Sequence, residues 1–283
     1  MSISLVYLCR GKGAGIVAAD RFIDFYSKND PGCEHNFVVI LKGWEKNQNF
    51  EKNALKLRFK VLGANFIELA DDGFDWGAYM RVAKILRTKY IFFLNSFSRP
   101  LNDFWLKHML DCIESNNVGM CGASAALKGW KFSWPYFNFE LKTFIIYPLK
   151  VIRRFYNYML VYHFYTKHYC PHLRSNGFAV ERNTFLKFSN LRGIPSSKQD
   201  CYLLESGANS YSDYIKAVGK NLVLVDKNGV MHDICDWGSS NTYCCPGQPN
   251  LCIADNNTDL YEAKSQTAKR QMEFDVWGEV FNE

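Results

Sequence analysis

Residues 73–100 read GFDWGAYMRVAKILRTKYIFFLNSFSRP, and this stretch decides the class of fold. A loop that contains Gly and Asp leads into residues 77–86, which have helical spacing, and then into an apolar run at 90–94. Continuous bulky apolar residues are typical of a strand that is buried on both faces of a sheet. The strand is followed by Asn95, Ser96, Phe97 and Ser98, and then by Arg99 and Pro100.

The same alternation of apolar strand and helix extends over the first half of the chain. Apolar runs predict four further strands, at residues 4–9, 37–41, 66–69 and 118–122. Helical spacing predicts three further helices, at residues 16–26, 50–61 and 103–113. This order predicts an α/β fold with a mostly parallel central sheet, helices on both faces and a Rossmann-like first half.

Ligands of such sheets bind beyond the carboxyl ends of the strands. Four polar or glycine-bearing loops follow the predicted strands, at residues 10–11, 42–44, 70–75 and 95–98. The candidate ligand-binding side chains and backbone positions in these loops are Arg10, Gly11, Lys42, Asp72, Asp75, Asn95 and Ser96. Asp72 and Asp75 could instead cap the helix at 77–86, and Asn95 and Ser96 could form a simple turn.

Composition limits the classes of partner. The formal net charge of +6 fits an anionic small substrate or a phospholipid surface, and it is too low to indicate nucleic acid. The N-terminus lacks the basic and apolar regions of a signal peptide, so we expect a cytoplasmic protein whose ten cysteines are reduced. The cysteines include no C-x-x-C pair, which argues against a zinc site.

The second half of the chain contains a basic, aromatic segment at residues 140–167. It is too highly charged to span a bilayer, but a helix of this composition can lie at a membrane surface. The alternative is a helix packed on the sheet or on a second copy of the chain. Both interpretations stay open from the sequence.

Two carboxylates follow in the stretch KQDCYLLESG, residues 198–207. We expect Asp200 and Glu205 to lie around the start of a helix at 210–218, where a carboxylate is stabilised by the helix dipole. Residues 172–188 predict a strand, a turn at Arg182 and Asn183, and a short helix. Residues 224–240 predict two strands around a turn at 228–229, and a lone His232 there is expected to be structural.

This layout resembles the A-type-fold glycosyltransferases, and within them the family-two-like group that builds bacterial surface polysaccharides. The resemblance covers about residues 3–225 and depends on three motifs, G-F-D-x-G-A-Y with the strand YIFFLNS, then SNGFAVERNTFLKF, then KQDCYLLESG. It implies a single domain over residues 1–283. Residues 1–125 would bind the nucleotide sugar, and residues 126–283 would bind a glycan or lipid-linked acceptor.

The resemblance also implies roles for the candidate residues. The post-strand loops would contact the donor, and Arg174 and Asn176 would contact phosphate or acceptor. An inverting transfer needs a base that takes the proton of the acceptor hydroxyl, and either Asp200 or Glu205 would supply it. The chain departs from the family at residues 41–44, LKGW, which lack the acidic residue that often contacts the nucleotide base.

Asn95 and Ser96 stand where the family has an acidic pair after the strand. Carboxylates there hold Mg²⁺ or Mn²⁺ on the donor diphosphate, because hard cations prefer anionic oxygen ligands. Neutral oxygens predict weak dependence on a metal, or none. Positive charge would then come from basic residues in the candidate loops, which are Arg10, Lys12, Lys42, Arg99 and Arg174.

The sequence therefore predicts a sugar-nucleotide-dependent, inverting glycosyltransferase of polysaccharide or lipopolysaccharide biosynthesis. Two alternatives stay open. The glycine-rich loop RGKGAG, residues 10–15, is faintly similar to the loop of nucleotidyltransferases that make sugar nucleotides. The missing acidic pair would also fit a non-catalytic binding protein on a degenerate transferase fold.

Overall fold

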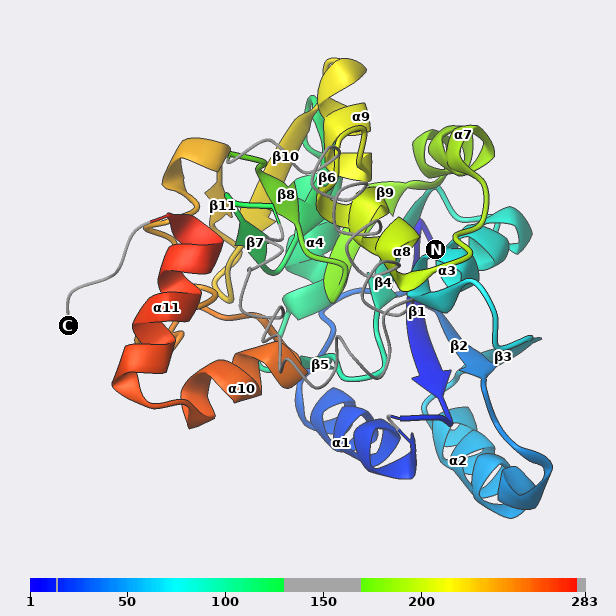
Figure 1. Cartoon of the computed structure of the whole chain (residues 1–283). Helices are drawn as coiled ribbons and strands as arrows, with labels where there is room; N and C mark the ends of the chain where they lie inside the picture. Colours follow the sequence, from blue (N-terminus) through cyan, green and yellow to red (C-terminus); the bar gives the residue numbers. More distant parts are fainter. Residues whose placement is uncertain (14, 130–168, 279–283) are drawn as a thin grey trace, which may run out of the picture.

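The computed structural model describes residues 1–13, 15–129 and 169–278 of the chain. Its centre is an eight-stranded sheet in the order β11-β10-β6-β9-β4-β1-β2-β3 (Figure 1). β1, β2, β3 and β4 pair in parallel, as do β6 and β10. β9 is antiparallel to both of its neighbours, and β11 is antiparallel at the edge. The predicted α/β class and mostly parallel sheet are confirmed.

Most strands of the main sheet are buried and apolar, as the sequence patterns predicted, whereas the edge strands β3 and β11 contain no buried residue. Their bounds are β1 Ile3–Arg10, β2 Asn36–Lys42, β3 Asn65–Leu69, β4 Tyr90–Leu94, β6 Val118–Gly122, β9 Gly177–Glu181, β10 Asn221–Val225 and β11 Met231–His232. Four short strands form two separate pairs, β5 Arg99–Pro100 with β12 Ile253–Ala254, and β7 Ala125–Ala126 with β8 His172–Leu173.

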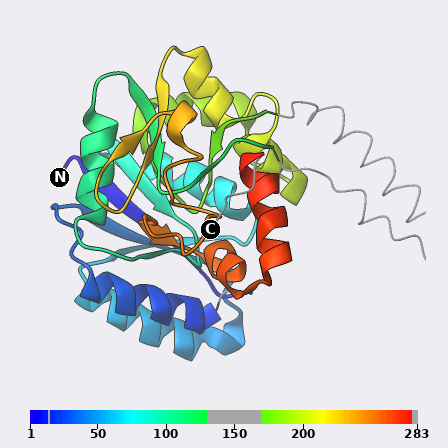
Figure 2. The same ribbon diagram turned by 90° about the vertical axis from the view of Figure 1, so that its left-hand side faces the viewer.

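Helices cover both faces of the sheet (Figure 2). The core on one face includes side chains of α1 Gly15–Lys28, α2 Asn49–Val61 and α4 Trp105–Glu114. The core on the other face includes side chains of α3 Phe74–Ile85, α7 Arg182–Arg192, α8 Lys198–Ser206, α9 Tyr211–Ala217, α10 Asn256–Ala263 and α11 Gln266–Trp277. The short helices η1 Lys46–Gln48 and η3 Ile234–Asp236 lie in connections.

Two elements differ from the predictions for the second half. Asp200 and Glu205 do not precede a single helix at 210–218, because they belong to a separate helix, α8, which begins after Ser197 and ends before Gly207. Arg182 and Asn183 form no turn, because they start α7 directly after β9. The predicted turn at 228–229 is present, with Gly229 in the left-handed region at φ 79°. The segment 140–167 lies outside the described residues.

No helix in the described ranges is both long and apolar enough to cross a membrane. The carboxyl ends of β1, β2, β3 and β4 meet at one edge of the sheet, because these strands are parallel. The hydroxyl of Tyr7 in β1 donates a hydrogen bond to the carbonyl of Ser96, 2.8 Å away, and so fixes the turn after β4 against β1. This edge is where the sequence predicted a ligand.

Candidate active site

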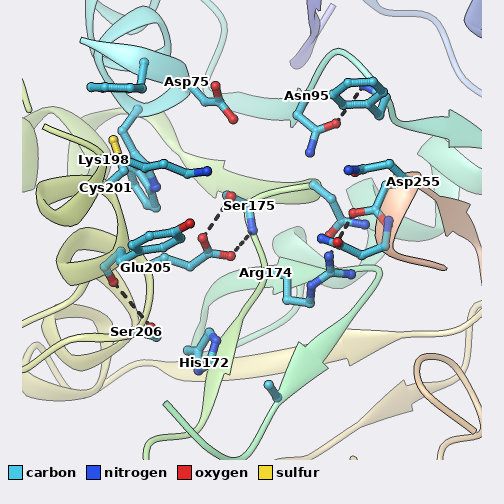
Figure 3. A pocket seen from close by; sticks show the side chains of 18 of the residues that line it. Asp75, Asn95, His172, Arg174, Ser175, Lys198, Cys201, Glu205, Ser206 and Asp255 are labelled. Atoms are coloured by element: carbon cyan, nitrogen blue, oxygen red, sulfur yellow. Dashed lines mark hydrogen bonds and ion pairs between the residues drawn. The ribbon is translucent and has the colours of Figure 1, made fainter. Parts of the chain in front are cut away.

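A cavity of about 1120 Å³ opens beyond the carboxyl ends of β1 and β4. This volume is at the upper end of the range for small-molecule sites and is large enough for a nucleotide sugar. Seven of the predicted site residues line it, namely Arg10, Asp75, Asn95, Ser96, Arg174, Asn176 and Glu205. They come from five separate parts of the chain, and Figure 3 shows several of them around the opening.

Four predicted site residues, Gly11, Lys42, Asp72 and Asp200, do not line this cavity. Gly11 lies where the chain approaches the next loop closely, since a Cβ there would be 2.7 Å from the carbonyl oxygen of Gly43. Asp72 forms an exposed ion pair with Arg81, with 2.7 Å between Oδ2 and Nη2. These two residues therefore shape or border the site and do not face it.

Lys42 has a structural role that the sequence did not indicate. Its side chain is buried, and its Nζ donates hydrogen bonds of 2.6 Å to the carbonyls of Asp72 and Phe74. Gly73 and Phe74 both adopt left-handed conformations, with φ of 69° and 52°. A left-handed Phe is strained, so the Lys42 ammonium stabilises a loop conformation that places Asp75 at the cavity.

Asp75 and Glu205 both line the cavity, and neither forms an ion pair among the described residues. Burial raises the pKa of Asp75, the positive charge of Lys42 opposes this rise, and the negative charge of Glu205 adds to it. Burial likewise raises the pKa of Glu205, against hydrogen bonds from Ser175 and the charge of Arg174. Raised carboxylate pKa values in one cavity are typical of acid and base catalysts.

Glu205 is held in place at the last turn of α8. Its Oε1 accepts a hydrogen bond of 2.7 Å from the Ser175 N–H, and its Oε2 accepts one of 3.1 Å from the Ser175 hydroxyl. Ser175 immediately precedes Asn176 and β9, so the carboxylate is fixed to the central sheet. Both oxygens keep further lone pairs for a ligand.

Asp200 has a different environment, although it belongs to the same helix. It forms a capping box with Ser197, the N-cap of α8, and its Oδ2 accepts hydrogen bonds from the N–H groups of Ser196 and Ser197. Burial raises the pKa of Asp200, but these hydrogen bonds outweigh burial and leave the pKa below its ordinary value. These are the properties of a helix cap.

The basic residues that were expected to bind phosphate already have partners. Arg10 pairs with Asp71 at 3.1 Å, Lys12 with Glu45 at 3.5 Å, and Lys42 with backbone carbonyls. Arg99 pairs with Asp259 at 2.6 Å, and Arg174 pairs with the buried Asp255 at 2.8 Å. Arg99 also does not line the cavity. The expectation that these five residues replace the charge of a metal is therefore weakened.

Lys198 lines the cavity and forms no ion pair or hydrogen bond among the described residues. Figure 3 shows its amino group directed into the opening, between Asp75 and Glu205. Its charge lowers the pKa of Asp75, which places the two groups within electrostatic reach. Two buried donors at the cavity wall, Nδ2 of Asn176 and Nε1 of Trp76, also have no acceptor within the described structure. Such donors suit a ligand that is rich in oxygen.

The side chain of Asn95 stabilises the chain directly after β4. Its Oδ1 accepts hydrogen bonds of 2.9 Å from the Phe97 N–H and from the Ser98 hydroxyl, so it forms the turn that the sequence allowed as one interpretation. Figure 3 shows the amide nitrogen of Asn95 directed into the cavity. Asn95 can therefore donate a hydrogen bond to a ligand, whereas its oxygen is engaged.

Two oxygen-bearing side chains of the cavity, Asn95 and Asp255, already have partners that a divalent cation on a donor diphosphate would have to displace. The oxygen of Asn95 is engaged in the turn, and Asp255 is engaged by Arg174 and by the N–H groups of Asn257 and Thr258. Across residues 1–13, 15–129 and 169–278, no three His, Cys, Asp or Glu side chains gather as a metal site. Hard cations need several such oxygens.

The sequence missed one wall of the cavity entirely. This wall comes from residues 243–276 and includes Tyr243, Asp255, Asn256, Asn257, Gln271 and Phe274. The Asp255-x-x-Thr258 spacing, which forms a capping box at the start of α10, was the one local signal available. Nothing in the sequence indicates that this helix packs beside β5, because the contact between β5 and β12 joins distant residues.

His172 is a second missed residue of the cavity lining. Its Nδ1 lies 2.8 Å from the Cys170 carbonyl and donates to it. Burial lowers the pKa of His172 to about 4, so the imidazole is neutral at physiological pH. His232, in contrast, lies 3.3 Å from Asp226 in the β10–β11 hairpin and has the structural position that was expected.

No protein-family model and no curated protein matches this chain. Among solved structures, it is similar to the mannosyltransferase PcManGT from Pyrobaculum calidifontis in complex with GDP-Man and Mn²⁺, at 11% identity and a TM-score of 0.47, over 78% of this chain and 53% of that one. It is also similar to GalNAc-T7 with UDP, GalNAc and Mn²⁺, at 11% identity and a TM-score of 0.49, over 80% of this chain and 42% of that one. This chain therefore spans about half the length of each.

A third similar structure is a CMP:2-keto-3-deoxy-manno-octonic acid synthetase complexed with CTP, at 10% identity and a TM-score of 0.44, over 79% of this chain and 89% of that one. The matches thus include glycosyltransferases, as the predicted resemblance implied, and also a synthetase in complex with CTP. Likeness at this level concerns the arrangement of strands and helices alone and says nothing about activity.

Proposed function

We propose that this protein is a glycosyltransferase that moves a sugar, with inversion, from a nucleotide sugar to a hydroxyl group of a glycan or lipid-linked acceptor. The proposal includes a place in the biosynthesis of a cell-surface polysaccharide or lipopolysaccharide. The observation that carries the chemical part is the convergence of Glu205, Asp75 and Lys198 on one cavity at the carboxyl edge of the sheet.

Glu205 is the proposed general base. Its carboxylate takes the proton of the acceptor hydroxyl while the acceptor oxygen bonds to the anomeric carbon. The bond between that carbon and the donor phosphate breaks, and a nucleoside diphosphate leaves with the bonding electrons. A base acts best when its pKa is close to the working pH, and burial moves the pKa of Glu205 in that direction.

Asp75 and Lys198 have proposed roles on the donor side. The Asp75 carboxylate can accept hydrogen bonds from sugar or ribose hydroxyls, and the amide nitrogen of Asn95 can donate to the same ligand. The Lys198 ammonium is placed to neutralise charge on the leaving diphosphate, since it has no acid partner within the described part of the chain. A fixed positive charge near a developing anion stabilises the transition state.

A nucleotidyltransferase that makes a sugar nucleotide is the second candidate. The observation in its favour is the glycine-rich loop after β1, in which Arg10, Lys12 and Gly13 line the cavity and Gly15 begins α1. Backbone N–H groups in such a loop at a helix start can bind phosphate. Both candidates use a nucleotide at the same edge of the sheet.

Product analysis distinguishes the two candidates and the non-catalytic alternative. The purified protein is incubated with a panel of nucleotide sugars, and separately with nucleoside triphosphates plus sugar phosphates. Release of a nucleoside diphosphate from one nucleotide sugar supports the glycosyltransferase, whereas release of pyrophosphate from a triphosphate identifies the nucleotidyltransferase. Binding of a nucleotide without turnover in either panel, and with lipid-linked acceptors added, contradicts both enzymes.

A further inference from the structure

The outer face of α2 exposes three large apolar side chains. The exposed fractions are 84% for Phe50, 68% for Leu57 and 87% for Val61. Their separations of seven and four residues, with the exposed Ala54 between them, place all of them on one stripe of the helix. Single exposed apolar residues are ordinary, but an aligned set on one helix indicates a surface with a partner.

This stripe, which we call the α2 stripe (Phe50, Ala54, Leu57 and Val61), is not needed for the fold. The opposite face of α2 supplies the core contacts, through the fully buried Leu55 and Phe59. α2 is therefore apolar on two sides, although one packed side is enough to hold it on the sheet. The second apolar side has no contact in the described protein that explains it.

The charges around the α2 stripe select the kind of partner. Residues 46–61 contain five lysines and arginines and one glutamate. Lys52 and Lys56 pair with Glu68, and Arg58 pairs with Asp20, whereas Lys46 and Lys60 have no acid partner among the residues that the structure covers. Association of two copies through this face would bring like charges together, so an anionic partner is favoured.

The first turn of α2 lies at the cavity edge of the sheet, so a partner on the α2 stripe would also be near the cavity. α2 follows the carboxyl end of β2 through the short helix η1, so Phe50 starts from the same edge of the sheet that carries the cavity. Figure 1 shows α2 beside α1 on the outside of the molecule, with α1 between α2 and α10. A flat surface can therefore reach α2 without covering the wall formed by residues 243–276.

We propose that the α2 stripe docks this protein on an anionic lipid bilayer. Phe50, Leu57 and Val61 enter the boundary between headgroups and acyl chains, while Lys46 and Lys60 remain at the headgroup level. Interfacial helices bind by this combination of apolar burial and attraction to anionic lipid. Docking through the α2 stripe requires neither the segment 140–167 nor the reaction proposed for the cavity.

The test is co-sedimentation with vesicles of phosphatidylcholine alone and with vesicles that also contain about 30% phosphatidylglycerol, an anionic lipid. The wild-type protein is expected to bind the anionic vesicles, with binding that weakens as salt increases. Leu57→Asn with Val61→Asn should lower the partition coefficient about tenfold or more, because each substitution removes an apolar side chain from the interface. Lys46→Gln with Lys60→Gln should lower binding to anionic vesicles only.

A matched control is Leu191→Asn with Val218→Asn, which removes two exposed apolar side chains from other parts of the surface, 71% and 47% exposed. This control should bind vesicles as the wild type does. Vesicle binding that the α2 substitutions leave unchanged overturns the proposal, as does the absence of any binding by the wild type. Concentration-dependent dimers that dissociate in the Leu57 and Val61 variant would assign the α2 stripe to a second copy and also overturn it.

Discussion

Glu205 differs from Asp255, which also lines the cavity, in how its charge is compensated. Asp255 pairs with Arg174 and accepts two backbone hydrogen bonds, whereas Glu205 accepts hydrogen bonds only from Ser175 among the described residues. A buried carboxylate with so little compensation resists ionisation. At the scale of single residues, replacement of Glu205 is therefore expected to lower turnover without lowering the stability of the fold.

Glu205→Gln should lower turnover by about a hundredfold to ten-thousandfold, because general-base catalysis contributes a factor of that size. Nucleotide affinity should change by no more than a few-fold, since the amide keeps the shape of the side chain. The acid limb of the wild-type pH profile should lie above the ordinary pKa of 4.5, because burial raises the pKa of Glu205 and the base must be ionised. Near-normal turnover by the variant rules out the proposed base.

The raised pKa of Glu205 also predicts that the ionised carboxylate lowers the stability of the fold, although the proposed base must be ionised to act. Since the folded pKa of Glu205 is raised, its favourable contribution is present below the unfolded pKa and is lost as the pH rises through the folded pKa. Glu205→Gln should therefore melt at a higher temperature than the wild type at pH 8 and at a similar temperature at pH 4. A variant that is less stable at pH 8 would show that Glu205 is a structural residue.

Lys198 provides a second test at the residue scale. Lys198→Gln should weaken binding of a nucleoside diphosphate about tenfold to a hundredfold, since a hydrogen bond to a charged group has a net effect of that size. Lys187→Gln, on the exposed side of α7, is the matched control and should bind as the wild type does. Calorimetric titration with nucleoside diphosphates measures both variants. Equal affinities would show that Lys198 does not contact the diphosphate.

At the scale of elements, α8 explains why Asp200 and Glu205 have different roles. Successive residues of an α-helix are about 100° apart, so residues five apart differ by about 140° around the axis. Asp200 lies in the first turn, where it forms the capping box with Ser197 and does not line the cavity, whereas Glu205 lies in the last turn and lines it. From the sequence, Asp200 and Glu205 both remained candidates for the base, because α8 was not predicted as a separate helix.

Asp200→Asn should lower the stability of the protein and leave turnover per folded molecule unchanged. The amide accepts fewer of the hydrogen bonds that Ser196 and Ser197 donate, and loss of a helix cap costs about 1 kcal/mol. Because the folded pKa of Asp200 is lowered, its stabilisation is present above the unfolded pKa of 3.8 and disappears at lower pH. Thermal melts at pH 7 and pH 3 test this, and a large loss of turnover would return Asp200 to the list of candidate bases.

The residue at the turn after β4 is expected to determine how strongly the reaction depends on a divalent cation. Asn95→Asp keeps the oxygen that accepts from Phe97 and Ser98, and adds an anionic oxygen that faces the cavity. We expect a chelator to slow the wild-type reaction little, and Mn²⁺ to stimulate the Asp variant more than the wild type. Wild-type activity that a chelator abolishes and Mn²⁺ restores would contradict the interpretation of Asn95.

At the scale of the whole molecule, the cavity predicts that a nucleoside diphosphate stabilises the fold. A ligand at ten times its dissociation constant stabilises a protein by roughly 1.4 kcal/mol, which is expected to raise the melting temperature by a few degrees. A thermal-shift screen of nucleoside mono-, di- and triphosphates measures this rise in melting temperature and identifies the nucleobase that the cavity prefers. A complex with the nucleotide away from Arg10, Asp75 and Asn95 would show that the cavity has another ligand.

The order of the main strands and helices in residues 1–122 followed from the sequence alone, because burial and helical spacing are local patterns. The apolar runs at 4–9, 37–41 and 90–94 match β1, β2 and β4 closely, and the polar residues after β1 and β4 do line the cavity. The sequence also indicated that the position after β4 is neutral, since this requires only the identity of Asn95 and Ser96. These features depend on neighbours within a few residues.

The tertiary structure decided which polar side chains meet. Lys42 turned inward to backbone carbonyls, and the cations expected to bind phosphate proved to have acid partners up to 160 residues away, as Arg99 does with Asp259. The cavity wall at residues 243–276 joined the site through the pairing of β12 with β5. Ion pairs and cavity walls between distant residues depend on how the whole chain packs, and no local pattern in the sequence specifies them.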